Sequence, residues 1–179
     1  MLCSSTLLGS VSRSAATPAK LATSALIAQA GAWPPWLAAG TGLAARLGLK
    51  PVTLGGHGVM AIIQGGKPGP KIALRADMDA LPVTEKTGLP FASKATTTFR
   101  GETVCVMHAC GHDAHTGILM GVAEALVAMQ EDLPGQVMLI FQPAEEGEGG
   151  AASMLKDGLF NDFKPDAVFG LHVFATVQA

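Results

Sequence analysis

The sequence predicts an α/β protein in which a largely parallel or mixed sheet is flanked by helices. Short apolar runs typical of strands recur between residues 59 and 171, and a long segment with helical periodicity separates two of them. Gly- and Pro-rich segments stand between these runs. This βαβαβ rhythm implies mainly parallel strands with helices on the faces of the sheet. With 179 residues, 49 % of them apolar, the chain can bury one core of this kind.

The chain is predicted to divide into a head, residues 1–41, and a catalytic part, residues 42–179. The head is rich in Ser and Ala, and no acidic residue precedes Asp77. A targeting segment, a disordered extension and a spurious extension all fit this composition. A targeting segment would make the protein exported or organellar, and otherwise we expect it in the cytoplasm. Prolines and polar residues interrupt the apolar stretch of the head, so we expect no membrane span.

Two strands are expected first, at Val59–Ile63 and Lys71–Arg75. The Gly- and Pro-rich residues 65–70 between them predict a tight turn, so the two strands should be neighbours in the sheet. Residues 83–103 have no sustained period and predict a long loop, with a short hairpin around Thr96–Thr98.

A helix is predicted from Asp113 to Glu131, with Asp113 as its N-cap or first-turn acid. Apolar residues recur every three or four positions along it, and we expect this stripe to face the core. The stripe consists of Ile118, Val122, Leu126 and Met129.

The remaining elements are two strands and a short helix. Gln136–Gln142 is almost continuously apolar, which is typical of a strand covered on both faces. A short helix follows at Ala151–Lys156, and the last predicted strand is Ala167–Leu171.

Side chains that can bind a metal follow three of these strands and precede the long helix. They are Asp77, Asp79, Cys110, His112, Glu145, Glu146 and His172. Ligands of open α/β sheets bind at the carboxyl ends of the strands, so we expect these groups to converge at one edge. Thiolate, imidazole and carboxylate suit divalent transition metals, and a further carboxylate supplies the base that metal-assisted hydrolysis needs. The sequence therefore predicts a metallohydrolase site.

Each motif also has a simpler interpretation when taken alone. Adjacent Glu145 and Glu146 could form a solvated acidic loop, although like charges repel unless a cation or a shared proton reconciles them. A different chemistry would use Cys110 as a nucleophile with His108 or His172 as its base. That alternative leaves the two glutamates without a role. His108 and His115 also offer competing imidazoles beside His112.

Four segments together resemble the aminoacylase-type metallopeptidases and amidohydrolases. They read IALRADMDALP from Ile72, MHACGHD from Met107, QPAEEG from Gln142 and GLHV from Gly170. The similarity extends from about Gly42 to Val173. Within the family it is nearest to hippurate hydrolase, N-acyl-amino-acid amidohydrolase and auxin-conjugate hydrolase.

The resemblance implies roles for individual residues. Two divalent ions, with zinc or manganese preferred over cobalt or nickel, would be held by Cys110, His112, Glu146 and His172. Glu145 would be the general base, and Asp79 would hold the ligands in place without itself binding an ion. Asp77 stands where related enzymes carry a histidine ligand.

The resemblance also implies a reaction and its partners. A metal-activated water would cleave the amide bond of N-acyl amino acids or related amides. The expected partner is this small-molecule substrate, with no nucleic acid because the net charge is only −2, and no membrane. Full-length relatives are expected to be homodimers or larger oligomers.

Members of the family continue well beyond the segment matching Val173. The resemblance therefore predicts a chain shortened at its C-terminus, without the lid and dimerisation domain, a substrate-contacting histidine and the last metal histidine. The alternative to an active amidohydrolase is a non-catalytic remnant that binds metal or a partner.

Overall fold

The computed structural model describes residues 36–174 with the exception of residue 148. The predicted head therefore lies mostly outside the described residues, and its proposed boundary with residue 42 falls within the first described helix, α2 (Trp36–Arg46). The boundary at residue 42 stays a prediction. Among the helices of the described part, none is both long and apolar enough to cross a membrane.

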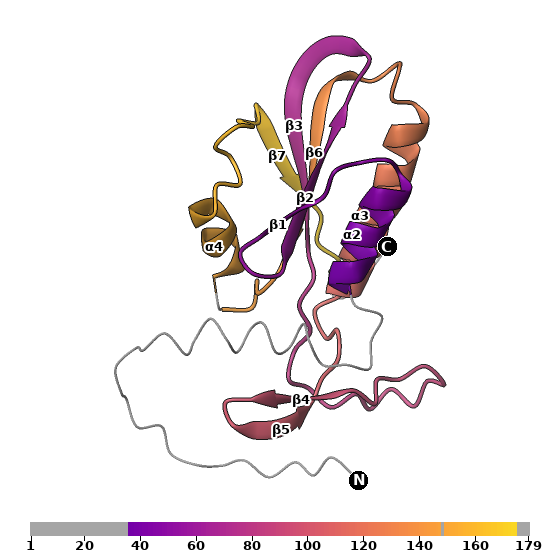
Figure 1. Cartoon of the computed structure of the whole chain (residues 1–179). Coiled ribbons are helices and arrows are strands. Elements are labelled where there is room, and N and C mark those ends of the chain that lie inside the picture. Colours follow the sequence, from indigo (N-terminus) through magenta and orange to yellow (C-terminus); the bar gives the residue numbers. More distant parts are fainter. Residues whose placement is uncertain (1–35, 148, 175–179) are drawn as a thin grey trace.

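The described residues form a five-stranded sheet, a separate two-stranded sheet and helices on both faces of the larger sheet (Figure 1). After α2 the elements are β1 (Val52–Leu54), β2 (Gly58–Gln64), β3 (Lys67–Asp77), β4 (Thr96–Phe99), β5 (Glu102–Cys105), α3 (His112–Ala128), β6 (Pro134–Gln142), α4 (Gly150–Lys156) and β7 (Ala167–Gly170). The predicted α/β class, the Thr-rich hairpin and the short helix are confirmed.

The order of strands in the larger sheet is β1-β2-β6-β3-β7. β3 runs parallel to both β6 and β7, whereas β1 with β2 and β2 with β6 are antiparallel, so the sheet is mixed. The prediction that the first two strands would be neighbours is wrong, because β6 lies between β2 and β3. A strand that is apolar on both sides buries most surface in the middle of a sheet, and β6 takes that place.

The core is divided by β6 into two clusters, one on each face of the sheet. Val137, Leu139 and Phe141 pack with residues of α2 and α3, whereas Met138 and Ile140 pack with residues of α4 and the segment after it. In Figure 1, α2 and α3 lie on one side of the sheet and α4 on the other. The prediction of a strand covered on both faces is confirmed.

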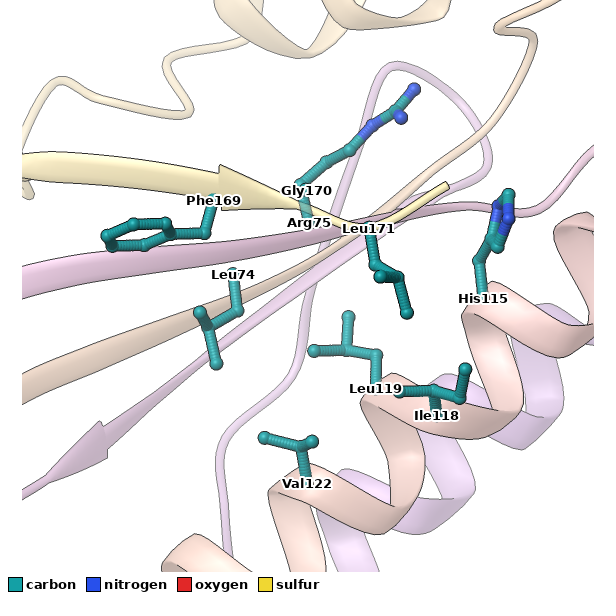
Figure 2. A pocket seen from close by; sticks show the side chains of 9 residues that line it. All are labelled: Leu74, Arg75, His115, Ile118, Leu119, Val122, Phe169, Gly170 and Leu171. Atoms are coloured by element: carbon teal, nitrogen blue, oxygen red, sulfur yellow. The ribbon is translucent and has the colours of Figure 1, made fainter. Parts of the chain in front are cut away.

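Helix α3 turns to the sheet a face that differs in part from the predicted one. Its buried residues are His112, His115, Thr116, Leu119 and Ala123. Of the predicted stripe, Ile118 is 45 % exposed and Met129 is 52 % exposed, whereas Leu126 packs against the core, so the stripe lies only partly on the buried face. The buried side chains in the first turns of α3 are polar. A prediction based on the spacing of apolar residues therefore does not identify them as buried. Ile118 and Val122 instead line an apolar groove between α3 and β7 (Figure 2).

The parallel arrangement places three carboxyl ends at one edge of the sheet. β3, β6 and β7 all end there, and α3 begins at the same edge after residue 111 (Figure 1). This edge carries the predicted metal-binding side chains.

Candidate metal centre

A left-handed glycine shapes the start of α3. Gly111 is the N-cap residue with φ of 81°, a conformation that side chains with a Cβ rarely adopt. A Cβ at this position would also clash with the side chain of Val173. The tight backbone at Gly111 brings Cys110 and His112, its two neighbours, to the same site.

His112 lies at the middle of the site and is fully buried. Its Nε2 is 3.8 Å from a carboxylate oxygen of Asp77, 3.9 Å from one of Glu146 and 4.0 Å from one of Glu145. Its Nδ1 is 3.3 Å from an oxygen of Asp79. Among the described residues neither ring nitrogen has a hydrogen-bond partner.

The surroundings of His112 fit a cation. A buried polar atom without a partner costs about 1–3 kcal/mol. A divalent ion between the imidazole and the glutamates would satisfy Nε2 and at the same time reconcile the neighbouring negative charges. The residues present therefore suit a metal site.

Cys110 and His172 form the second part of the site. The Sγ atom of Cys110 is 3.4 Å from Nε2 of His172. Nδ1 of His172 is 2.7 Å from the carbonyl oxygen of Val173, and a carbonyl can only accept, so Nδ1 donates its proton there. Nε2 is thus left with its lone pair directed toward the sulfur.

The ionisation of Cys110 depends on its surroundings. Burial raises the pKa of the thiol to about 11, and the hydrogen bond and negative charge of Glu146 act in the same direction. Without a cation the group is a protonated thiol at neutral pH. A thiolate at this position requires a positive charge beside it, which a metal ion supplies.

The two glutamates are anchored through their backbone. Asp79 accepts the N–H of Glu145 through Oδ1 and the N–H of Glu146 through Oδ2, each at 3.0 Å. The side chains remain accessible, with 41 % of Glu145 and 32 % of Glu146 exposed. Asp79 therefore fixes the loop through its backbone while both glutamate side chains stay accessible to solvent.

Asp77 lies fully buried beneath these groups. It accepts hydrogen bonds from Nδ1 of His115 at 2.6 Å and from Nη1 of Arg75 at 2.7 Å. Burial alone would raise the pKa of Asp77, but the bond from His115 and the charge of Arg75 outweigh it and hold the pKa below its usual value. Asp77 is thus a carboxylate that the protein itself has already paired.

Within the part of the chain that the structure describes, three sets of side chains bring possible ligand atoms within 4.8 Å of one another. They are Cys110–His112–His172, His112–Glu145–Glu146 and Asp77–His112–His115. The first two sets hold every residue predicted as ligand or base, and His112 is common to all three. His108, which the sequence offered as a competing imidazole, belongs to none of these sets. Burial lowers the pKa of His108.

Sequence reasoning missed the pairing of Asp77 with His115. The available signal was the three-residue spacing of His112 and His115, which places two imidazoles on one helix face. From the sequence, His115 was related to His112 as a competing imidazole and was not connected with Asp77.

Thiol, imidazole and carboxylate groups gathered at the carboxyl edge of an α/β sheet characterise the class of metal-binding hydrolases. The family model for "Peptidase family M20/M25/M40" matches residues 73–179. The chain belongs to this family, whose members compared below are hydrolases.

Two curated relatives and one solved structure illustrate the match. The N-acetyl-L-cysteine deacetylase of Bacillus subtilis is 52 % identical over 115 residues, which are 64 % of this chain and 25 % of the relative. The hippurate hydrolase of Campylobacter jejuni is 48 % identical over 119 residues, 66 % of this chain and 28 % of the relative. The chain thus spans about a quarter of the length of these relatives.

The solved structure is a Bacillus subtilis protein described as a dinuclear metal-binding peptidase of the M20 family. It superposes with a TM-score of 0.66 at 38 % identity, covering 79 % of this chain and 38 % of the other.

Proposed function

We propose that the chain provides the metal-binding part of a metal-dependent amidohydrolase that acts on N-acyl amino acids or related amides. Residues 42–179 would form the N-terminal part of its catalytic domain. The observation that carries the proposal is the buried imidazole of His112, whose two nitrogens have no hydrogen-bond partner among the described residues and face four carboxylates. Relatives named as an N-acetyl-L-cysteine deacetylase and a hippurate hydrolase support the substrate class.

The proposed ligands are Cys110, His112, Glu146 and His172. Thiol and imidazole favour zinc, and the carboxylate would also admit manganese, cobalt or nickel. When bound, two divalent ions would lower the pKa of a water molecule and polarise the carbonyl of the amide. Cys110 would contribute a sulfur donor and the two histidines nitrogen donors, and Glu146 would balance the charge.

Glu145 is the proposed general base. Its Oε2 lies 4.0 Å from Nε2 of His112, and its backbone is held by Asp79 while its carboxylate remains partly exposed. From this position the carboxylate can accept the proton of the attacking water and then transfer it to the departing amine. Asp79 itself touches no reacting atom and acts by orienting the loop.

The proposal is tested with the full chain by chelation and metal restoration. Hydrolysis of N-acetyl-L-cysteine and of hippurate is followed together with zinc and manganese content by elemental analysis. We expect the chain to take up metal, and any hydrolysis that it catalyses should stop with chelator and return with metal. Failure to take up any metal would refute the proposal.

The same experiment distinguishes the proposal from the alternative, a cysteine hydrolase. That enzyme would keep its activity in chelator and lose it on alkylation of Cys110. The raised pKa of Cys110 opposes this alternative, because the thiol is protonated where a nucleophile must be a thiolate.

A second candidate function is the binding of another polypeptide, and the edge strand β7 favours it. Within the described residues β7 pairs with β3 alone, and Val168, Phe169 and Leu171 are each more than half exposed. An unpaired apolar edge promotes association with a further strand. Metal uptake without hydrolysis, together with concentration-dependent association in sedimentation experiments, would support this candidate.

A further inference from the structure

We propose that His115 and Asp77 form a positioning pair that fixes the chain after β7 and so keeps the imidazole of His172 against Cys110. The inference rests on the proposed metal centre. It assigns His115 no contact with substrate or with an ion.

The hydrogen bonds of His115 define its protonation. His115 is 2 % exposed, and its Nε2 lies 2.9 Å from the backbone nitrogen of Val173. A backbone N–H can only donate, so Nε2 must be the acceptor and the ring proton must be on Nδ1. Nδ1 then donates to Asp77 at 2.6 Å. Both nitrogens of the neutral ring are used, which leaves neither for an ion.

Asp77, which lies in β3, is in turn linked to two other elements. Its second oxygen accepts from Arg75, whose Nε donates to Oε1 of Gln142 at the end of β6. The hydroxyl of Thr116 in α3 donates to the backbone carbonyl of Asp77 at 2.9 Å. The network therefore connects β3, β6 and α3 and ends at Val173. Buried bonds of this kind reinforce one another.

In the described part of the chain, the segment that follows β7 is not held by strand pairing. The paired register of β7 with β3 ends at Gly170, so His172 stands beyond the last ladder pair in an exposed segment. The bond from Val173 to His115 joins this segment to the buried network one residue after His172. The rings of His115 and His172 are also close, with centroids 4.6 Å apart. Figure 2 shows His115 at the beginning of α3, and His115 and Leu171 both line the groove between α3 and β7.

The first test uses metal-free protein and is independent of the proposed function. Nitrogen-edited NMR of the imidazole rings should show His115 with its proton on Nδ1, and the amide of Val173 should exchange slowly with solvent. A proton on Nε2, or rapid exchange of the Val173 amide in the folded protein, would overturn the inference. Both measurements test the pairing of His115 even if the wild-type chain binds no metal.

The second test compares two substitutions that differ in which nitrogen they replace. The amide of His115→Gln can reach the position of Nε2 and accept the Val173 N–H, whereas that of His115→Asn reaches only the position of Nδ1. Titration with Co²⁺ reports affinity, and the absorption spectrum reports the histidine and thiolate ligands. We expect a loss of affinity of about 10- to 100-fold in His115→Asn, the range for residues that orient a ligand, with partial recovery in His115→Gln.

The matched control is His57→Asn, at a histidine in the turn between β1 and β2, where Co²⁺ binding should be unchanged. Circular dichroism identifies variants that fail to fold, and Asp77→Asn then provides the second variant, with the same loss expected. Equal Co²⁺ affinity and equal spectra in wild type, His115→Asn and His115→Gln would contradict the inference. So would an equal loss in the two His115 variants.

Discussion

The candidate metal centre has a buried half and an open half, and they are built differently. In the buried half, the polar atoms of Asp77 and His115 are satisfied by neighbouring protein groups. In the open half, the side chains of Glu145 and Glu146 are partly exposed, and both carboxylates lie near the same ring nitrogen of His112, at 4.0 Å and 3.9 Å from Nε2. The protein thus completes the buried half by itself, whereas the open half needs a cation to be complete.

His112 stands at the junction of the two halves and should show the largest effect. The substitution His112→Ala removes the imidazole that is common to all three sets of possible ligands. We expect the affinity for zinc to fall by more than about 100-fold, because about 100-fold is the upper limit for residues that only orient a ligand. Isothermal titration with zinc measures the change. The matched control His57→Ala should bind as wild type, and an unchanged zinc affinity in His112→Ala would contradict the comparison.

Within the open half, the two glutamates should separate into a base and a ligand. Glu145→Gln should retain metal but lower the rate of hydrolysis by about 10²- to 10⁴-fold, because a neutral amide cannot accept the proton of water. Glu146→Gln should lose metal as well. Metal content and kcat are measured for both variants. If the two variants behave identically, the assigned roles are contradicted.

Asp79 connects the halves and should have a smaller effect. Asp79→Asn keeps only one carbonyl oxygen for the two backbone N–H groups of Glu145 and Glu146, so the loop loses one of its two anchors. We expect zinc affinity to fall by about 10- to 100-fold. Asp162→Asn, at an exposed position, is the control, and equal affinities in the two variants would refute a role for Asp79.

The smallest effect concerns the reactivity of Cys110 in metal-free protein. Because its pKa is raised to about 11, the thiol stays protonated at pH 7 and gains thiolate only as the pH approaches 11. Alkylation by iodoacetamide should therefore be roughly tenfold slower at pH 7 than that of an ordinary cysteine and should increase with pH. Mass spectrometry of the Cys110 peptide measures the rate. An inflection below pH 9 would contradict the raised pKa.

The sequence predicted those features that depend on local patterns. The apolar run of β6 indicated burial on both faces, and the positions of acids, Cys and His after strands indicated convergence at one edge. The roles of Cys110, His112, Glu145, Glu146 and His172 nevertheless remain predictions, since a cluster of suitable donors is not a bound ion.

Features that depend on contacts distant in sequence were not predictable. The turn after β2 contained no information that β6, about 70 residues later, would lie between β2 and β3. The face of α3 was only partly predicted because His112, His115 and Thr116 are polar and yet buried, so the helix rotates partly away from its apolar stripe. The tautomer of His115 follows only from its position beside the N–H of Val173.

The central claim is that Cys110, His112, Glu146 and His172 surround a shared cation site. It is tested most directly by zinc reconstitution of the full chain, elemental analysis and X-ray absorption at the zinc edge. The expected result is bound zinc, up to two ions per chain, with a sulfur neighbour at about 2.3 Å and nitrogen or oxygen neighbours at about 2.0–2.2 Å. A chain that remains free of zinc, or zinc without a sulfur neighbour, would contradict the claim.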